Sequence, residues 1–190
     1  MKKRSPGVWA HPEMLVGISA VVIGVCALTV SLYEVNLMRA EQRAAVVPLI
    51  EFGRSYFFSD AAGQPEGWQL SVHAENVGLG PARVMDFRIT VDGAPQLSWR
   101  SAMQALLGRD EPVAIILSSI NGRIIPANRS IQMFQLKDSQ LATEIVEEFD
   151  RLEIEACFCS VFDDCWTKNM VENAAVPVES CESSALSFQG

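Results

Sequence analysis

Four of the five cysteines in this chain lie in its last third, at Cys157, Cys159, Cys165 and Cys181. Thiols can form disulfides, bind zinc or exchange electrons, and spacing and compartment decide between these chemistries. An even number of cysteines in an oxidising compartment predicts two disulfides, and four cysteines allow three pairings. The sequence around them therefore has to indicate which pairing is favoured.

Strand alternation favours one of the three pairings. The segment 152–159 alternates as a β-strand, so Cys157 and Cys159 lie on the same face. Cys159 can then reach across a hairpin to Cys165, which leaves Cys157 for Cys181. We predict the bridges Cys159–Cys165 and Cys157–Cys181, and the second would tie the C-terminal segment to the domain.

Zinc binding and thiol redox chemistry are the alternatives to structural bridges. Four thiolates could bind zinc, but the C-x-C, C and C spacing lacks the paired C-x₂-C knuckles of common zinc sites. Zinc would become the better interpretation if the domain were cytosolic. A redox pair at Cys157 and Cys159 would lack the helix N-terminus that lowers the thiol pKa in C-x-x-C motifs. We therefore prefer structural bridges and predict no metal site and no cofactor.

Residues for nucleophilic or acid–base catalysis do not form a recognisable set. The chain has two histidines. His11 precedes the apolar segment described below, and His73 alternates with Val72 and Ala74, which predicts a solvated, outward-facing side chain. A triad needs a histidine beside a nucleophile and an acid, and neither a calcium loop nor a phosphate loop motif is present. We predict no catalytic residues, with a cell-surface hydrolase or thiol-redox enzyme as the alternative.

The element that positions all of these residues is an uncharged segment, Met14–Tyr33. As a helix it would reach about 30 Å, the thickness of a bilayer's hydrocarbon core. Lys2, Lys3 and Arg4 precede it, which favours a cytoplasmic N-terminus. A cleaved signal peptide would have a shorter apolar core and a small-residue cleavage site. We therefore predict an uncleaved signal anchor in the inner (plasma) membrane, with the domain in the periplasm or outside the cell.

Small residues recur on one face of this segment at steps of three and four, which places them on the same side of a helix. Small residues let a second membrane helix approach closely. We expect the helix to pack there against another copy or another envelope or membrane protein, in addition to the lipid bilayer. The residues of this predicted seam are Gly17, Ala20, Gly24, Ala27 and Ser31.

Residues 48–190 have the pattern of a β-sandwich. Strands are predicted at 49–58, 68–75, 83–91, 113–118, 123–125, 130–136, 151–162 and 165–170, with helices at 101–107 and 139–149. Trp68, Leu70 and Val72 should share one face, and Asp92-Gly93 should form a tight turn. The predicted fold is mainly β, an N-terminal transmembrane helix plus an immunoglobulin-like sandwich with two short helices. The predicted order is a cytoplasmic tail (1–13), the membrane helix (14–33), a helical stalk (34–47) that Pro48 ends, and the extracytoplasmic domain (48–190).

A glycine-rich corner, Asn76-Val-Gly-Leu-Gly-Pro-Ala82, separates the second and third predicted strands. Gly78 and Gly80 permit positive φ, Pro81 fixes the exit and Asn76 can bond its neighbouring backbone. This N-x-G-x-G-P-A segment resembles the corner of bacterial adhesion-type and CARDB-like immunoglobulin sandwiches.

The layout of the chain also resembles uncharacterised single-pass bacterial envelope proteins. In these, a stalk with the pattern R-A-x-x-R-A leads into P-x-I/L-E-F, which correspond here to residues 39–44 and 48–52. The resemblance extends to the segment CFCSVFDDCW at 157–166. It implies an immunoglobulin-like extracytoplasmic domain and brings no known activity.

Charge is distributed unevenly along the chain. Residues 34–137 contain ten acidic and ten basic side chains, whereas residues 138–182 contain twelve acidic and two basic ones. The acidic region argues against nucleic acid or an anionic bilayer as its partner. It leaves open a solvated surface or a docking face for a basic partner. We predict a membrane-anchored envelope protein with a non-enzymatic binding or structural role. An accessory subunit packed into a membrane complex through its helix is the alternative.

Overall fold

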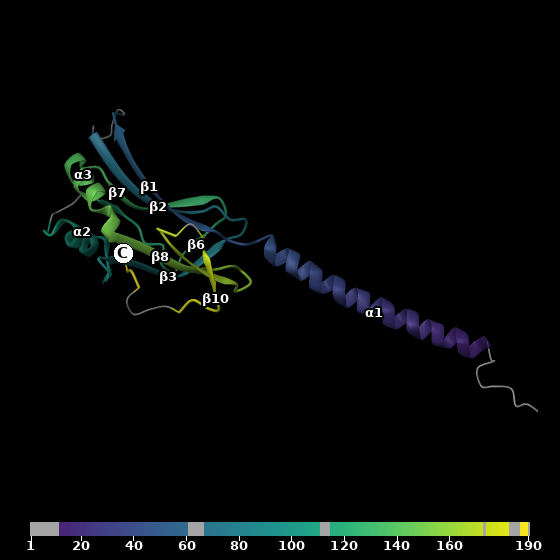
Figure 1. The fold of residues 1–190 in the computed structure, drawn as a ribbon. Coiled ribbons are helices and arrows are strands. Elements are labelled where there is room, and N and C mark those ends of the chain that lie inside the picture. The colour runs from purple at the N-terminus through teal and green to yellow at the C-terminus, as the bar shows by residue number, and fades with distance from the viewer. Residues whose placement is uncertain (1–11, 61–66, 111–114, 173, 183–186, 190) are drawn as a thin grey trace, which may run out of the picture. The chain divides into compact units, whose positions relative to one another are not determined.

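The computed structural model describes residues 12–60, 67–110, 115–172, 174–182 and 187–189, in two compact units, Met1–Ala44 and Ala45–Gly190 (Figure 1). Unit 1 contains one helix, α1 (Pro12–Ala44), whose described side chains are exposed. The hydroxyls of Ser19 and Thr29 donate hydrogen bonds to carbonyls one turn earlier. These polar groups are therefore satisfied inside the helix, as a hydrocarbon environment requires.

Among the described residues, α1 is the one helix long and apolar enough to span a membrane, and a signal sequence would have the same properties. It ends at Ala44 and not at residue 47, so the predicted stalk is three residues too long. A Cβ atom added at Gly17 or Gly24 would meet nothing within 4 Å. The small-residue seam therefore stays a prediction, and residues 1–11 of the predicted tail lie outside the described residues.

Unit 2 contains two antiparallel sheets. Sheet A has the strand order β1 (Ile50–Ser59), β2 (Gly67–Asn76), β7 (Arg129–Leu136) and β5 (Ile115–Leu117). Sheet B has the order β10 (Val176–Val178), β9 (Cys165–Asn169), β8 (Leu152–Cys159), β3 (Ala82–Val91) and β4 (Ala94–Gln96), and β6 (Ile124–Ile125) pairs with the start of β3. The predicted Asp92-Gly93 turn is confirmed, because Val91 pairs with Ala94.

The inner faces of the two sheets share one hydrophobic core. Phe52 of β1 approaches Phe87 of β3 with ring centroids 6.5 Å apart. Two helices, α2 (Trp99–Leu107) and α3 (Ser139–Glu147), add buried side chains to this core and begin at capping residues Ser98 and Asp138. The fold is therefore a mixture of two sheets, one long apolar helix and short helices.

The C-terminal segment returns to the core through Phe188. Its side chain is fully buried and its backbone N–H donates to the carbonyl of Phe87 at 2.7 Å. The Phe188 ring packs edge-on against Phe87 and Trp99. The chain end is thus part of the core, which the sequence patterns did not indicate.

Several predicted boundaries need correction. Strands β4 and β10 were not predicted, and α2 begins two residues before residue 101. The helix predicted at 139–149 ends at Glu147, and a 3₁₀ turn covers Phe149–Arg151. Trp68, predicted to share a face with Leu70 and Val72, lies near the start of β2, where it is 42% exposed and stacks on Tyr56. Residues 111–114, which include part of a predicted strand, lie outside the described residues.

Candidate functional site

Asn76 organises the end of unit 2 at which residues 45–49 enter the domain. Its side chain is fully buried. Its Oδ1 accepts hydrogen bonds from the backbone N–H groups of Leu49 (3.1 Å) and Gly78 (3.0 Å). Its Nδ2 donates to the carbonyls of Gly80 (2.8 Å) and Ile125 (2.9 Å). The side-chain amide of Asn76 therefore joins the segment just before β1, the glycine-rich corner and β6. This is a wider role than the local hydrogen bonding predicted for Asn76.

Gly78 and Gly80 are required for a reason other than the one predicted. Positive φ values occur at other glycines of the described chain, not at these two. A Cβ atom at Gly80 would lie well inside 3.0 Å of the Val46 backbone, and one at Gly78 equally close to the Leu49 backbone. The corner lies directly against residues 46–49, so close approach and not backbone conformation excludes a side chain. Pro81 then leads into β3.

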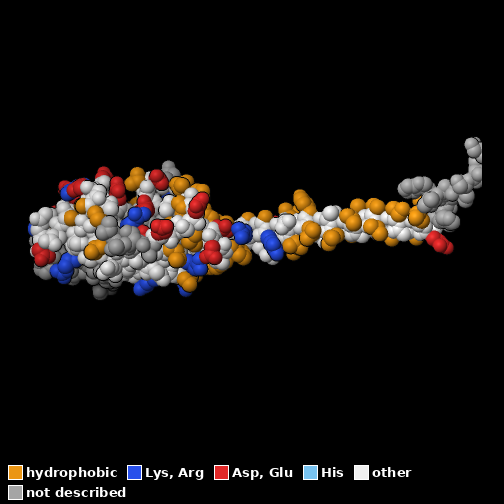
Figure 2. All heavy atoms as spheres, turned by 90° about the horizontal axis from the view of Figure 1, so that it is seen from below, with side chains coloured by type: hydrophobic (Ala, Val, Ile, Leu, Met, Phe, Trp, Pro, Cys, Tyr) orange, Lys and Arg blue, Asp and Glu red, His pale blue; other side chains and the backbone are white. Residues whose placement is uncertain are grey.

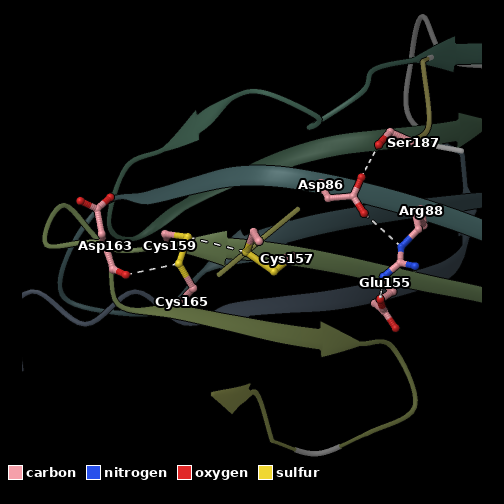
Figure 3. The surroundings of a disulfide bond; sticks show 9 residues. Asp86, Arg88, Glu155, Cys157, Cys159, Asp163, Cys165 and Ser187 are labelled. Carbon is pink, nitrogen blue, oxygen red and sulfur yellow. Dashed lines mark hydrogen bonds and ion pairs between the residues drawn. A yellow bond between two sulfur atoms is a disulfide. The ribbon is translucent and has the colours of Figure 1, made fainter. Parts of the chain in front are cut away.

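The two disulfides lie side by side on the outer face of sheet B (Figure 3). Cys159 is bonded to Cys165, its register partner across the β8–β9 hairpin, and Cys157 is bonded to Cys181. The Cys159 and Cys181 sulfur atoms are 3.6 Å apart. Three of the sulfurs, from Cys159, Cys165 and Cys181, lie within 4.8 Å of one another, so they could bind a metal ion only after reduction.

A buried carboxylate, Asp86, lies beside this disulfide pair (Figure 3). Asp86 is 2% exposed, accepts a hydrogen bond from Ser187 and pairs with Arg88 Nε at 3.1 Å. Arg88 in turn pairs with Glu155 on β8. A bulge between Val84 and Asp86 shifts the register of β3. This series of side-chain interactions, from Ser187 through Asp86 and Arg88 to Glu155, links the C-terminal segment to β3 and β8.

The same face carries a polar hollow of about 510 Å³ beneath the C-terminal segment. Its walls are mixed in charge, with Arg88 as the basic side chain among acidic ones. The lining thus combines carboxylates, one guanidinium group and hydroxyl groups. The lining residues are Asp86, Arg88, Cys157, Thr167, Glu179, Ser180 and Glu182.

Lys168 is a second buried charge that the sequence did not reveal. It lies on the inner side of β9 and is 3% exposed. Its Nζ is 3.2 Å from Glu51 on β1 and donates to the carbonyl of Glu172. The carboxylate and the carbonyl compensate the buried ammonium group, and the ion pair joins β9 of sheet B to β1 of sheet A.

His73 lies on the outer face of sheet A, as alternation predicted, but it is half-buried and not fully solvated. Its ring covers Gly53 of β1, where a Cβ atom would clash with the imidazole. Ser71, the neighbour on that face, is buried and accepts a hydrogen bond from Gln132. Among the described residues, His73 has no ion pair with a carboxylate, and the geometry of a triad is not present there.

Arg151 forms the main exposed ion-pair cluster, at the opposite end of β8. It bonds both Asp92 (2.6 Å) and Glu148 (2.9 Å). The hydrogen bond from Arg151 lowers the pKa of Asp92 below its ordinary value of 3.8. Hydrogen bonds from Arg109 and Gln140 similarly lower the pKa of Glu144. These shifts follow from surface ion pairs and do not mark a reactive group.

No protein-family model matches this chain, and no curated protein is significantly similar to it.

Proposed function

We propose that this protein is a single-pass, membrane-anchored envelope protein whose exported domain has a non-enzymatic binding or structural role. In this proposal α1 is an uncleaved anchor with a cytoplasmic N-terminus. Residues 45–190 form an immunoglobulin-like sandwich in the periplasm or outside the cell. The observation that carries it is the combination of an apolar, fully exposed helix with a domain closed by two disulfides.

Disulfides persist in oxidising compartments and are rare in the cytosol. A chain that enters the membrane through α1 and carries Cys157–Cys181 and Cys159–Cys165 beyond it is consistent with export of unit 2. The helix is apolar over about 30 Å on all sides, which suits contact with lipid and not with a protein core. The helix thus supports insertion into a membrane, and the disulfides support the oxidising side for the domain.

The strand order supports an immunoglobulin-like assignment. In a constant-type immunoglobulin domain, strands A, B, E and D form one sheet and C, F and G form the other. Sheet A here has the order β1-β2-β7-β5, which corresponds to A-B-E-D, and β9-β8-β3 corresponds to G-F-C. The bridges differ, because Cys159–Cys165 joins neighbouring strands F and G and not strands B and F. Such domains commonly present their loops or faces to partners.

A binding role is favoured over catalysis because three buried polar side chains form hydrogen bonds or ion pairs within the fold. Asn76, Asp86 and Lys168 are each buried and each held by named partners. The polar hollow beneath the C-terminal segment provides a surface for a partner's polar or basic group. No histidine is among its lining residues, so it does not have the Ser-His-Asp arrangement.

Protease accessibility tests the proposed topology. Cells producing the full chain are converted to spheroplasts and treated with a protease that does not cross the plasma membrane. The proposal predicts that residues 45–190 are degraded and that an epitope placed at the N-terminus is retained on a membrane-bound fragment. Protection of the domain in intact spheroplasts, with digestion only after lysis, would place it in the cytoplasm and refute the proposal.

A further inference from the structure

The two disulfides on sheet B are in contact with each other. The Sγ atoms of Cys159 and Cys181, which belong to different bridges, are 3.6 Å apart. Figure 3 shows this contact as a dashed line from Cys159 to the sulfur that is bonded to Cys157. The Cys165 sulfur lies within 4.8 Å of the sulfurs of both Cys159 and Cys181. A thiolate formed at one bridge therefore has the other bridge within reach.

Burial favours exchange between the bridges over attack by a second external thiol. Cys157, Cys159 and Cys165 are 6%, 4% and 7% exposed, and Cys181 is half-buried. The thiolate is the attacking species in disulfide exchange. Two groups held in contact react as if at a very high effective concentration, which a reagent in solution does not reach. Once one bridge is open, the neighbouring bridge is therefore the nearest target.

The position of Cys181 allows it to be bonded to either of two cysteines on β8. Cys157 and Cys159 lie on the same face of this strand, about 6.6 Å apart along it. Cys181 is bonded to the first and its sulfur contacts the second. The loop that ends at Cys181 would contain 24 residues in one case and 22 in the other, so the chain entropy of the two bridges is nearly equal.

We propose that these bridges form an exchange pair, in which reduction of Cys159–Cys165 transfers Cys181 from one cysteine of β8 to the other. A thiolate of a dithiol reductant attacks Cys165 Sγ, the Cys159–Cys165 bond breaks, and its electron pair leaves on Cys159. The Cys159 thiolate then attacks Cys181 Sγ. The Cys159–Cys181 bond forms as the bond to Cys157 breaks, and the Cys157 thiolate takes up a proton. The second thiol of the reductant attacks the mixed disulfide, which releases Cys165 as a thiol and leaves the reductant as a disulfide.

The exchange converts Cys157 from a bridge partner into a thiol. Cys157 lines the polar hollow together with Arg88 and Thr167. Reduction by two electrons thus places a modifiable thiol in the hollow, while the C-terminal segment stays covalently tied through Cys159. The inference goes beyond the proposed function and concerns unit 2, so the result of the protease experiment neither supports nor overturns it.

Partial reduction of the full chain in detergent tests the inference. α1 exposes hydrophobic side chains along its length (Figure 2), and its cysteine, Cys26, is free, so all samples carry Cys26→Ser to remove this thiol. A limiting amount of tris(2-carboxyethyl)phosphine takes the place of the dithiol. One sample is reduced at about pH 8, where thiolates form, and the matched control at about pH 3, where thiols stay protonated and exchange stops. Free thiols are then cyanylated in acid, and peptide mapping identifies the bridge that each singly reduced molecule retains.

We expect the bridge Cys159–Cys181, with Cys157 and Cys165 free, to be several-fold more abundant after reduction at the higher pH. In the acidic control the retained bridge should be one of the two native ones. The same native bridges at both pH values, or a bridge between Cys165 and Cys181 in place of Cys159–Cys181, would overturn the inference.

The variant Cys165→Ser, also with Cys26→Ser, tests the exchange step without a reductant. It leaves Cys159 with a free thiol in contact with the Cys157–Cys181 bridge. Because the two possible loops are nearly equal in length, we expect both Cys157 and Cys159 to be found as free thiols, each in part of the molecules. Circular dichroism checks that the variant is folded. A folded variant in which Cys159 alone is free would overturn the inference, and the partial reduction decides the question if the variant does not fold.

Discussion

The side chain of Asn76 bonds four backbone groups that the corner would otherwise bury without partners. We expect Asn76→Ala to lower the free energy of unfolding by about 3 kcal/mol, because buried donors and acceptors left without partners cost about 1–3 kcal/mol each. Urea unfolding of the full chain in detergent micelles, followed by tryptophan fluorescence, measures this. Gln96→Ala is the control, since Gln96 makes one local hydrogen bond at an exposed site, and it should change stability by less than about 0.5 kcal/mol. Equal effects would contradict the role of Asn76.

Two glycines of unit 2 lie against different kinds of neighbour. At Gly80 an added Cβ would meet the Val46 backbone, whereas at Gly53 it would meet the His73 imidazole. A side chain can rotate away and a hydrogen-bonded backbone cannot, so Gly80→Ala should destabilise the domain more than Gly53→Ala. Thermal unfolding of the two variants in parallel gives the order, and a larger loss for Gly53→Ala would refute close approach as the reason for Gly80.

The pair Asp92–Arg151 makes a specific prediction about pH. Because Arg151 lowers the pKa of Asp92 in the folded state, the pair stabilises the fold above the unfolded pKa and loses this effect as pH falls through the folded value. Asp92→Asn should therefore reduce the difference in stability between about pH 7 and about pH 3, while asparagine still tolerates the positive φ of this turn position. Unfolding midpoints at the two pH values measure it.

The control for this prediction is Asp60→Asn. Asp60 is exposed and has no ion pair among the described residues. The substitution Asp60→Asn should leave the pH dependence of stability unchanged. Added salt should reduce the effect of Asp92→Asn, because the Asp92–Arg151 ion pair is exposed. A pH dependence that Asp92→Asn does not alter would show that the ion pair contributes nothing to acid stability.

At the scale of elements, the two disulfides close loops of different length. Cys157–Cys181 spans 24 residues and Cys159–Cys165 spans six. The chain-entropy relation gives about 3–4 kcal/mol for the longer loop and about 2 kcal/mol for the shorter one. We expect Cys157→Ser with Cys181→Ser to cost more stability than Cys159→Ser with Cys165→Ser, measured by urea unfolding. The reverse order would mean that the C-terminal segment is held chiefly by Phe188.

The elements could be predicted where their signals are local in the sequence. Alternation in 152–159 put Cys157 and Cys159 on one face, and the structure joins Cys159 to Cys165 and Cys157 to Cys181. Asn76 could be assigned to a corner because its neighbours are glycines and a proline. The reason why position 80 requires glycine could not be predicted, because it depends on the backbone of Val46, which lies more than 30 residues earlier.

The groups that sequence analysis missed depend on contacts between distant segments. A bulge in β3 next to Asp86 shifts the alternation of inward and outward side chains. The sequence pattern of residues 83–91 does not reveal this shift. Lys168 on β9 reaches Glu51 on β1 of the other sheet, and Phe188 enters the core beside Phe87 of β3. A lysine or a terminal phenylalanine carries no local sign of such a partner, so three-dimensional structure was needed to find them.

At the scale of the whole molecule, the proposed function combines two features. We propose that the apolar helix α1 anchors the chain in a membrane and that the domain closed by two disulfides is exported. This export requires unit 2 to fold on the oxidising side of the membrane.

A count of reactive thiols on carbonate-washed membranes tests this central claim most directly. Cells producing the full chain are lysed under acid to trap thiols, and the washed membranes are denatured and treated with a maleimide polymer before and after reduction. We expect the protein to stay in the membrane pellet with one reactive thiol, Cys26, before reduction and with all five cysteines reactive after it. Release of the protein by carbonate, or five reactive thiols without reduction, would contradict it.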